Sequence, residues 1–428
     1  MCLIMKSLKF LFATAIVACA MTSCSDSDDE LAPGTNEPPM ATESHPAKAI
    51  ELTAQQQDMT KSLQIFSWEI FEAISVQQRE SGKNENLIFS PLSLEIELAM
   101  LLNGLQGETL QGMLDMMHLS GYDTEQLNQY FKRILDGIED ADNVTRFVTA
   151  NSLWYDKRYM LVPGVEQSLS DYYDCEFYPV VYGKEATAKI NKWVDDRTYG
   201  RIKKIIDNTT PDFDFYHLIN AVYFRSPWQN KMTACGTKPF TQIDATTVQA
   251  KMFKGAINNG YYKSTSQYQV VMLPFSNAAF GMFFLLPDED VTFSDVYTSV
   301  KASGETFAQL PGRRVNVTIP EFEVEQRMNM INSLLALGGE KLLASPTVNI
   351  LEGWTGALPS IYQTANIKVN EEGAEAAAVT VVLDGATGGD KDEPVYITFD
   401  RPFIYGIVER STGLPLFMGE ISMLNKVN

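Results

Sequence analysis

Hydrophobic residues recur at helical spacing in the first part of the chain. The first such run lies within residues 63–74, where apolar side chains three or four positions apart predict a helix with one buried face. Ser90 and Pro91 are the preferred cap and first residue of a second helix, which Gly104 ends. Thr124 is the expected cap of a third helix over residues 124–138. The apolar positions of these helices, with those of a fourth, are Leu63, Phe66, Ile70, Ile74, Leu94, Leu98, Leu101, Leu102, Leu127, Phe131, Ile134, Ile138, Ile190, Trp193 and Val194.

From about residue 215 onward the pattern favours β-strands. Val315, Val317 and Ile319 alternate with polar residues, which predicts a strand with one solvent-facing side. Residues 282–286 are apolar without interruption, which predicts a strand covered on both faces. Helices followed by strands indicate an α+β domain with more than one sheet. The expected strands cover residues 215–224, 270–274, 280–286, 315–319, 361–369, 396–399, 403–408 and 416–421.

The chain has 428 residues and a formal net charge of −20. No proline-rich or low-complexity segment interrupts it between about residue 56 and about residue 384, which favours one large domain over residues 56–428. The negative charge argues against binding of nucleic acid or of anionic lipid, because phosphate groups are bound by clustered Lys and Arg. Three histidines are too few for a histidine-rich metal site, and no motif of a metalloprotease, a phosphate-binding loop or a serine hydrolase occurs. We therefore expect no enzyme activity, no metal and no cofactor.

Residues 1–23 are typical of a bacterial lipoprotein signal peptide. A short basic start precedes an apolar run over residues 10–20, which is too short to span a bilayer. Small residues then lead to Cys24, the expected site of lipidation, with Cys19 as a weaker alternative. We expect a cell-envelope lipoprotein that is exposed on the outer membrane, or a secreted protein. Its contact with the membrane is expected to be only through the N-terminal lipid.

Residues 24–55 are acidic and rich in proline, which predicts a flexible tether. The acidic run at residues 25–30 resembles the surface-export signal of Bacteroidetes lipoproteins. Only Cys175 and Cys235 lie in the body of the chain, and we expect two free thiols, with a disulfide between them as the alternative.

One segment near the C-terminus combines the features of a strand with those of a loop. In alternation, five of its residues form a small and mostly apolar face that suits a buried strand. Residues 384–393, which follow, are rich in glycine and charge, as in an exposed loop. We interpret the segment as a strand that can enter a sheet; the alternative is a helix in the alanine run, ending in an ordinary loop. The residues of the small face are Ala374, Ala376, Ala378, Thr380 and Val382.

This segment resembles the hinge and reactive loop of the serpins, the serine protease inhibitor family. The match extends over about residues 58–424. It implies an α+β serpin fold with three β-sheets, about eight or nine helices and an exposed reactive loop at about residues 371–394. The hinge residues that carry the resemblance are Glu371, Glu372, Gly373, Ala374, Glu375, Ala376, Ala377 and Ala378. Further matching segments are residues 86–93, 190–194, 220–224, 251–253, 319–322, 400–403 and 416–419.

The resemblance implies a monomeric inhibitor that is used once. In the family, a serine protease attacks the loop and forms an acyl-enzyme. The cut loop then inserts into the main sheet and traps the protease as a covalent complex. The small hinge residues favour inhibition, because little side-chain volume has to be buried. The alternatives are a non-inhibitory binding protein and an inhibitor of cysteine proteases that uses the same trap.

Two counts along the loop give different reactive bonds. The family's usual length, counted from Glu371, places the cut between Thr387 and Gly388. The small residues Ala386 and Thr387 before this bond suit an elastase-like or subtilisin-like protease. The family's usual spacing, counted back from Asp400, gives Lys391 instead, which would suit a trypsin-like protease.

The resemblance also implies a group of residues that controls opening of the main sheet. Where this chain has Gln363, the family commonly has a histidine, so we expect opening to be less sensitive to pH. Glu321 stands where a basic residue often pairs with the first hinge glutamate, Glu371, and we expect these two carboxylates to repel each other. The sheet-opening group consists of Ser90, Ser93, Asn220, Trp228 and Gln363.

Overall fold

The computed structural model describes residues 37–41, 43–209, 215–339, 347–354, 356, 361–375 and 393–426. Among these residues there are eight α-helices and one short segment, η1, whose backbone is kinked at Leu337 and Gly338. They are α1 (Ala54–Glu80), α2 (Pro91–Leu102), α3 (Gly107–Met116), α4 (Thr124–Ala141), α5 (Pro163–Tyr173), α6 (Lys184–Arg197), α7 (Phe293–Ser303), α8 (Ile331–Leu334) and η1 (Leu335–Gly339).

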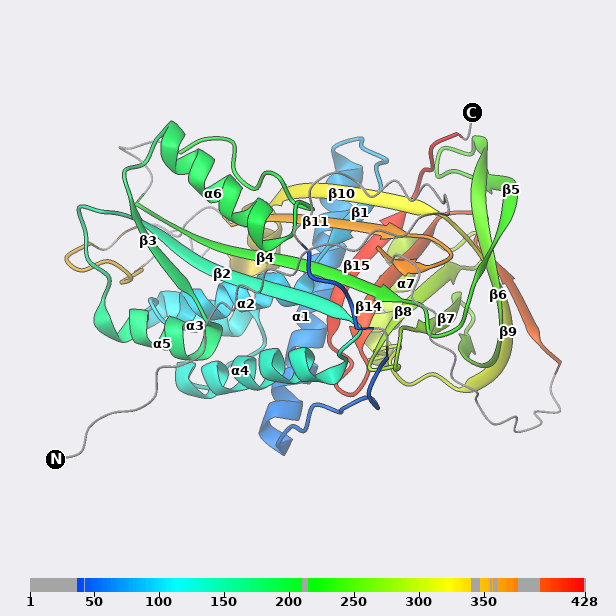
Figure 1. The fold of residues 1–428 in the computed structure, drawn as a ribbon, viewed down its shortest axis with the longest axis horizontal. Coiled ribbons are helices and arrows are strands. Elements are labelled where there is room, and N and C mark those ends of the chain that lie inside the picture. The colour runs from blue at the N-terminus through cyan, green and yellow to red at the C-terminus, as the bar shows by residue number, and fades with distance from the viewer. Residues whose placement is uncertain are drawn as a thin grey trace, which may run out of the picture. The chain divides into compact units, whose positions relative to one another are not determined.

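A six-stranded sheet crosses the molecule, and its long strands β4 and β2 span much of the view in Figure 1. On one face of this sheet, α6 packs Ile190 and Val194 into a cluster with Ile219 and Ala221 of β4. The alternate residues of β4, such as Phe224, face the main core, which also contains the buried side chains of α2. The strand order is β10 (Phe322–Asn329), β11 (Tyr362–Val369), β12 (Gly373–Ala374), β4 (Tyr216–Pro227), β2 (Arg146–Asp156) and β3 (Glu176–Val180).

The remaining strands form a nine-stranded network. The long strand β6 (Thr247–Ser264) pairs first with β5 (Thr233–Thr241), then with β9 (Gly312–Pro320) and finally with β7 (Tyr268–Pro274). The resemblance implied three β-sheets; among the described residues the strands form two hydrogen-bonded networks, because β6 joins β5, β9 and β7 into one. Its other members are β1 (Leu87–Phe89), β8 (Phe280–Pro287), β13 (Val395–Thr398), β14 (Phe403–Glu409) and β15 (Pro415–Ile421).

The expected helices correspond to α1, α2, α4 and α6, with one correction at a cap. Ser90 caps α2, since its side chain accepts a hydrogen bond from the N–H of Ser93 at 3.3 Å. In α4 the cap is Asp123, and Thr124 is the first helical residue. The Asp123 carboxylate accepts from the N–H of Gln126 at 2.8 Å, and the Gln126 side chain accepts from the N–H of Asp123 at 3.0 Å. This reciprocal pair satisfies two free donors at the helix start, which the threonine alone would not do.

The described part of the expected tether makes fixed contacts with the body. The N–H of His45 donates to Asn143 Oδ1 at 2.9 Å, and Asn277 Nδ2 donates to the carbonyl of His45 at 3.0 Å. Ile50 is 5% exposed and belongs to the main core. A composition that cannot form a core of its own can still supply a segment that packs against one. We call residues 37–50 the N-terminal arm.

Three further observations concern the two cysteines of the body and the membrane. Cys175 is buried and Cys235 is partly buried, and both thiols are free. Burial raises the pKa of Cys175 to about 12. No helix within the described residues is both long enough and apolar enough to cross a membrane.

Gly406 of β14 tests how tightly the nine-stranded network is packed. A Cβ at this position would lie 2.5 Å from the Phe283 ring and 2.7 Å from the carbonyl oxygen of Phe417. Gly406→Ala should therefore lower the free energy of unfolding by about 2 kcal/mol, because a packed sheet has no room for it. In Gly312→Ala, no described atom lies within 4 Å of the new Cβ, so this control should change by less than about 0.5 kcal/mol. Urea denaturation measures both, and equal midpoints would contradict the packing argument.

Candidate functional site

Strand β12 is two residues long and joins the halves of the six-stranded sheet. Ala374 lies opposite Val369 of β11 on one side and opposite Ser226 of β4 on the other. Gly373 lies opposite Pro227 of β4. Over their described residues, β11 and β4 form no ladder with each other. The sheet is therefore continuous at this point only through the first hinge residues.

Trp228 holds the chain just before the hinge. Its backbone N–H donates to the carbonyl of Glu372 at 2.9 Å, and its indole Nε1 donates to the carbonyl of Asn370 at 2.8 Å. The indole stacks on Phe275 with ring centroids 4.5 Å apart. The Asn370 side chain accepts from the N–H of Glu372 at 2.9 Å. Gly373 follows at φ 153°, a conformation that favours glycine. Trp228 thus fixes the base of the hinge.

The chain leaves the sheet directly after Ala374. The Ala374 side chain is fully buried, so the site accepts only a small residue without rearrangement. Glu375 has φ 47°, a left-handed conformation that turns the chain out of the strand, and its N–H donates to the carbonyl of Lys368 at 2.8 Å. Several predicted residues lie outside the described residues: Cys24, Ala376, Ala377, Ala378, Thr387, Gly388 and Lys391.

The carboxylate of Glu375 is buried next to a cluster of charges. Its side chain is 4% exposed, and Oε2 lies 3.4 Å from Nε of Arg201. Burial raises the pKa of Glu375 to about 7. The Arg201 guanidinium opposes this shift, whereas the Glu323 and Glu37 carboxylates add to it. Arg225, which faces Glu37 at 2.9 Å, and Arg146 complete the charged surroundings.

Gln363 holds the start of α2 with both ends of its amide. Its Oε1 accepts from the backbone N–H of Ser90, and its Nε2 donates to the carbonyl of Ser90, each at 2.8 Å. The Ser90 hydroxyl donates to the carbonyl of Leu416 at 2.7 Å. Gln363 and Ser90 are 3% and 1% exposed. Strand β11 is therefore tied to α2 by groups that have no access to water.

A second chain of hydrogen bonds ties β4 to α2. The Ser93 hydroxyl donates to Asn220 Oδ1, and Asn220 Nδ2 donates to Asn151 Oδ1 at 2.7 Å. Asn151 Nδ2 in turn donates to the carbonyl of Tyr173 at 2.8 Å. Asn151 was not among the residues that we predicted; its sign in the sequence was an amide in the middle of residues 146–156, which form β2. Four of the predicted sheet-opening residues thus meet at α2, and the fifth, Trp228, lies at the hinge.

Glu321 and Glu371 behave as the sequence suggested. Burial raises the pKa of Glu321, and the Glu371 carboxylate adds to the shift. Lys251 and Lys368 oppose it. The first hinge glutamate therefore faces a like charge at this position.

Among known protein families, the model described as serpin (serine protease inhibitor) matches residues 61–424 of this chain. The chain belongs to the serpin family. The expected fold class, an α+β serpin fold, is confirmed by this match and by the solved serpins that share it.

Two curated serpins show the extent of the similarity. Human neuroserpin is 27% identical over 366 residues, which cover 80% of this chain and 87% of neuroserpin. A serpin-like protein of Thermococcus kodakarensis is 28% identical over 377 residues, with 86% of each chain covered.

Two solved structures share the fold. An Arabidopsis serpin in its native stressed conformation has a TM-score of 0.75 at 24% identity, covering 87% of this chain and 99% of its own. Thyroxine-binding globulin in complex with thyroxine has a TM-score of 0.74 at 20% identity, covering 86% and 99%.

Gln363→Leu tests the link between β11 and α2. The change leaves the buried N–H of Ser90 without a partner and removes one of the two hydrogen bonds to its carbonyl, which still accepts from the N–H of Leu94 at 3.3 Å. We therefore expect the free energy of unfolding to fall by about 2 kcal/mol. Gln129→Leu, at an exposed glutamine of α4, is the control and should cost less than about 0.5 kcal/mol. Urea denaturation measures the free energy of unfolding of both variants. If Gln363→Leu lowers it no more than the control does, the Gln363 amide does not hold β11 to α2.

The raised pKa of Glu375 predicts a pH dependence of stability. The value of about 7 lies above the ordinary 4.5, so the folded protein holds the proton more tightly than the unfolded chain does. As pH rises from 4.5 through 7, the folded state loses stability, by at most about 3 kcal/mol. Glu375→Gln removes this loss. Urea denaturation from pH 5 to pH 8 should show the wild type losing stability relative to the variant. Parallel pH profiles would show that Glu375 does not titrate in this range.

Proposed function

We propose that this serpin inhibits serine proteases as a suicide substrate. The observation that carries the proposal is β12, a strand of two residues that occupies the start of a strand position between β11 and β4. Each neighbour of that position has backbone groups that a longer β12 would pair with. Insertion of the loop would therefore add hydrogen bonds along both edges, in the manner of a strand added to a sheet.

The register of β12 fits this insertion. Continued in its present register, the strand would place Thr380 opposite both Asn220 of β4 and Gln363 of β11. The face that Ala374 begins would continue with small side chains toward α2, at Ala376, Ala378, Thr380 and Val382. Small side chains can be buried on a packed core without displacing it, which supports fast insertion.

The chemistry of trapping would be supplied by the protease. Its serine would attack the carbonyl of Thr387 and form an ester, and the amine of Gly388 would leave with the C-terminal part of the chain. Insertion of the loop would then move the bound protease away before water hydrolyses the ester. Small residues at this bond favour an elastase-like or subtilisin-like target, and a cut at Lys391 a trypsin-like one. A cysteine protease would form the corresponding thioester.

We infer that lipidation at Cys24 anchors the inhibitor to the cell envelope. The signal-like residues 1–23 and the acidic run after Cys24 support display at the surface. In this arrangement the membrane is contacted through the lipid only, and the inhibitor acts as a monomer on proteases outside the cell.

A second candidate function is small-molecule binding without protease inhibition. A cavity of about 580 Å³ lies beside α1 and α7, lined by Trp68, Phe283 and Val300 together with Lys61 and Lys301. The thyroxine complex of thyroxine-binding globulin is an example of ligand binding by a protein of this fold. A binding protein of this kind would not need loop insertion, so cutting its loop should leave its melting temperature unchanged.

A pair of variants at Ala374 tests inhibition. We expect the wild type to form a complex with elastase or subtilisin that survives a denaturing gel, and to melt at a higher temperature once its loop is cut. In Ala374→Arg a charge would have to enter the core, so the loop should be cut without trapping the protease.

Ala374→Thr is the matched control, because a small side chain should still allow trapping. Absence of a stable complex with elastase-like, subtilisin-like and trypsin-like proteases, together with an unchanged melting temperature after cleavage, would reject inhibition in favour of the binding protein.

A further inference from the structure

Three arginines from three elements meet beside the hinge, on the α6 face of the sheet. Arg225 of β4 lies directly opposite Arg146 of β2, and Arg201 follows α6. Like charges directly opposite each other in an antiparallel pair repel, so this arrangement calls for anions. Two carboxylates supply them: Glu37 of the N-terminal arm and Glu375 of the hinge, whose side chains are each 4% exposed.

Glu37 contacts all three guanidinium groups. Its Oε2 accepts a hydrogen bond from Nη1 of Arg225 at 2.9 Å. Its Oε1 lies 3.6 Å from Nε of Arg146, and its Oε2 lies 3.8 Å from Nη2 of Arg201. The carbonyl of Pro39 also accepts from Nη2 of Arg146 at 3.5 Å. The arm is thus fixed at its start by a carboxylate that lies between the two facing arginines.

Glu375 is held less well by the same cluster. Its ion pair is with Arg201 at 3.4 Å, and its buried Oε2 has no hydrogen-bond partner among the described residues, although the Tyr223 hydroxyl lowers the pKa of the carboxyl. Oε1 of Glu37 also lacks a hydrogen-bond partner there, but Oε2 of Glu37 accepts from Arg225. The raised pKa of its carboxyl agrees with this weak pairing, and Glu37 contributes to that shift. The better-paired carboxylate is therefore the one from the arm.

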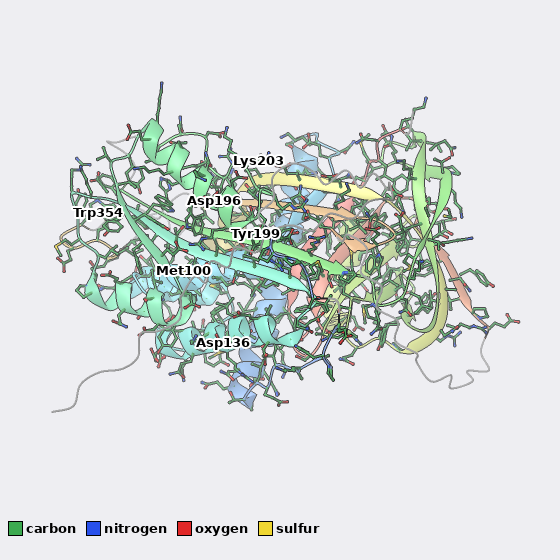
Figure 2. All side chains as sticks on the ribbon, in the orientation of Figure 1. Met100, Asp136, Asp196, Tyr199, Lys203 and Trp354 are labelled. Carbon is green, nitrogen blue, oxygen red and sulfur yellow. The ribbon has the colours of Figure 1, made fainter. Side chains whose placement is uncertain are left out.

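Extension of β12 would bring Glu375 to the arginine that Glu37 now occupies. Because Ala374 lies opposite Ser226, the next residue in the same register lies opposite Arg225. Aromatic rings hold the cluster in place: Arg146 lies over the ring of Tyr199 at 5.5 Å, and Arg201 over that of Tyr223 at 5.8 Å. Tyr199 lies beside β4 in Figure 2, and its ring centroid is 6.2 Å from that of Tyr223.

We propose that Arg146, Arg201 and Arg225 form a carboxylate-binding site in which Glu37 and Glu375 compete for Arg225, with Glu37 bound to it in the native state and Glu375 once the hinge extends. The N-terminal arm is then a brake on loop insertion, because Glu37 has to give up Arg225 before Glu375 can pair with it. Release of the arm leaves three guanidinium groups facing one carboxylate, which draws the hinge into the sheet. This inference rests on the proposed function, since it requires a loop that inserts.

The test measures uncut insertion of the loop in full-length protein, without a protease. Samples are incubated below the melting temperature, and the inserted form is separated on urea-gradient gels by its greater stability. We expect Glu37→Gln to convert at least about threefold faster than the wild type. Glu43→Gln, at an exposed glutamate of the same arm, should convert at the wild-type rate.

A second background separates competition from a loss of packing. In Glu375→Gln, the hinge has no carboxylate to bring to Arg225, so adding Glu37→Gln should no longer accelerate conversion. Acceleration that persists undiminished in this background would overturn the competition, as would a Glu37→Gln protein that converts at the wild-type rate.

Cutting the loop of the wild type distinguishes this inference from the proposed function. If the cut protein melts at a higher temperature while Glu37→Gln leaves the conversion rate unchanged, insertion stands and the brake fails. If the cut protein shows no gain in melting temperature, the loop does not insert, and the proposed function and the brake are both rejected.

Discussion

The architecture depends on one strand position, between β11 and β4, that is only partly filled. Strands β11 and β4 face the same strand position, and in their described parts only Gly373 and Ala374 fill it. Backbone groups of a central strand are normally paired, so under the proposed function a longer β12 would add hydrogen bonds to both neighbours and lower the free energy. The chain belongs to the serpin family, and under the proposed function the reactive loop would supply this strand.

Both neighbours of this strand position, β11 and β4, are held by α2, which packs on the core face of the sheet. Gln363 of β11 binds the backbone of Ser90, and Asn220 of β4 binds the hydroxyl of Ser93. These residues are buried, so moving the strands apart means breaking hydrogen bonds that water cannot readily replace. On the opposite face of the sheet, the arginine cluster and Glu37 surround Glu375, the first residue after Ala374. Under the proposed function the two faces would control different steps, because the α2 face would govern separation of the strands and the α6 face would govern entry of Glu375.

The sequence was informative where a property is local. Ser90 before Pro91 predicted the start of α2, and the small residues Gly373 and Ala374 do lie in the sheet; entry of the residues after them stays a prediction. It was uninformative where a residue depends on distant partners. Glu37 lies in a proline-rich segment and its three arginines follow more than 100 positions later, so nothing nearby marked it as buried. Strand β2 escaped notice because Asn151 interrupts its apolar pattern, and that amide is satisfied only through Asn220 and Tyr173.

A crystal structure of the protein after cleavage of its loop tests the central claim most directly. We expect one continuous strand from Gly373 to about residue 384 between β11 and β4. The register of β12 places Thr380 of that strand opposite Asn220 and Gln363. In that structure Glu375 would pair with Arg225, and Glu37 would have left it. A cleaved protein in which β11 and β4 are still linked only by Gly373 and Ala374, with the cut loop outside the sheet, would contradict the account.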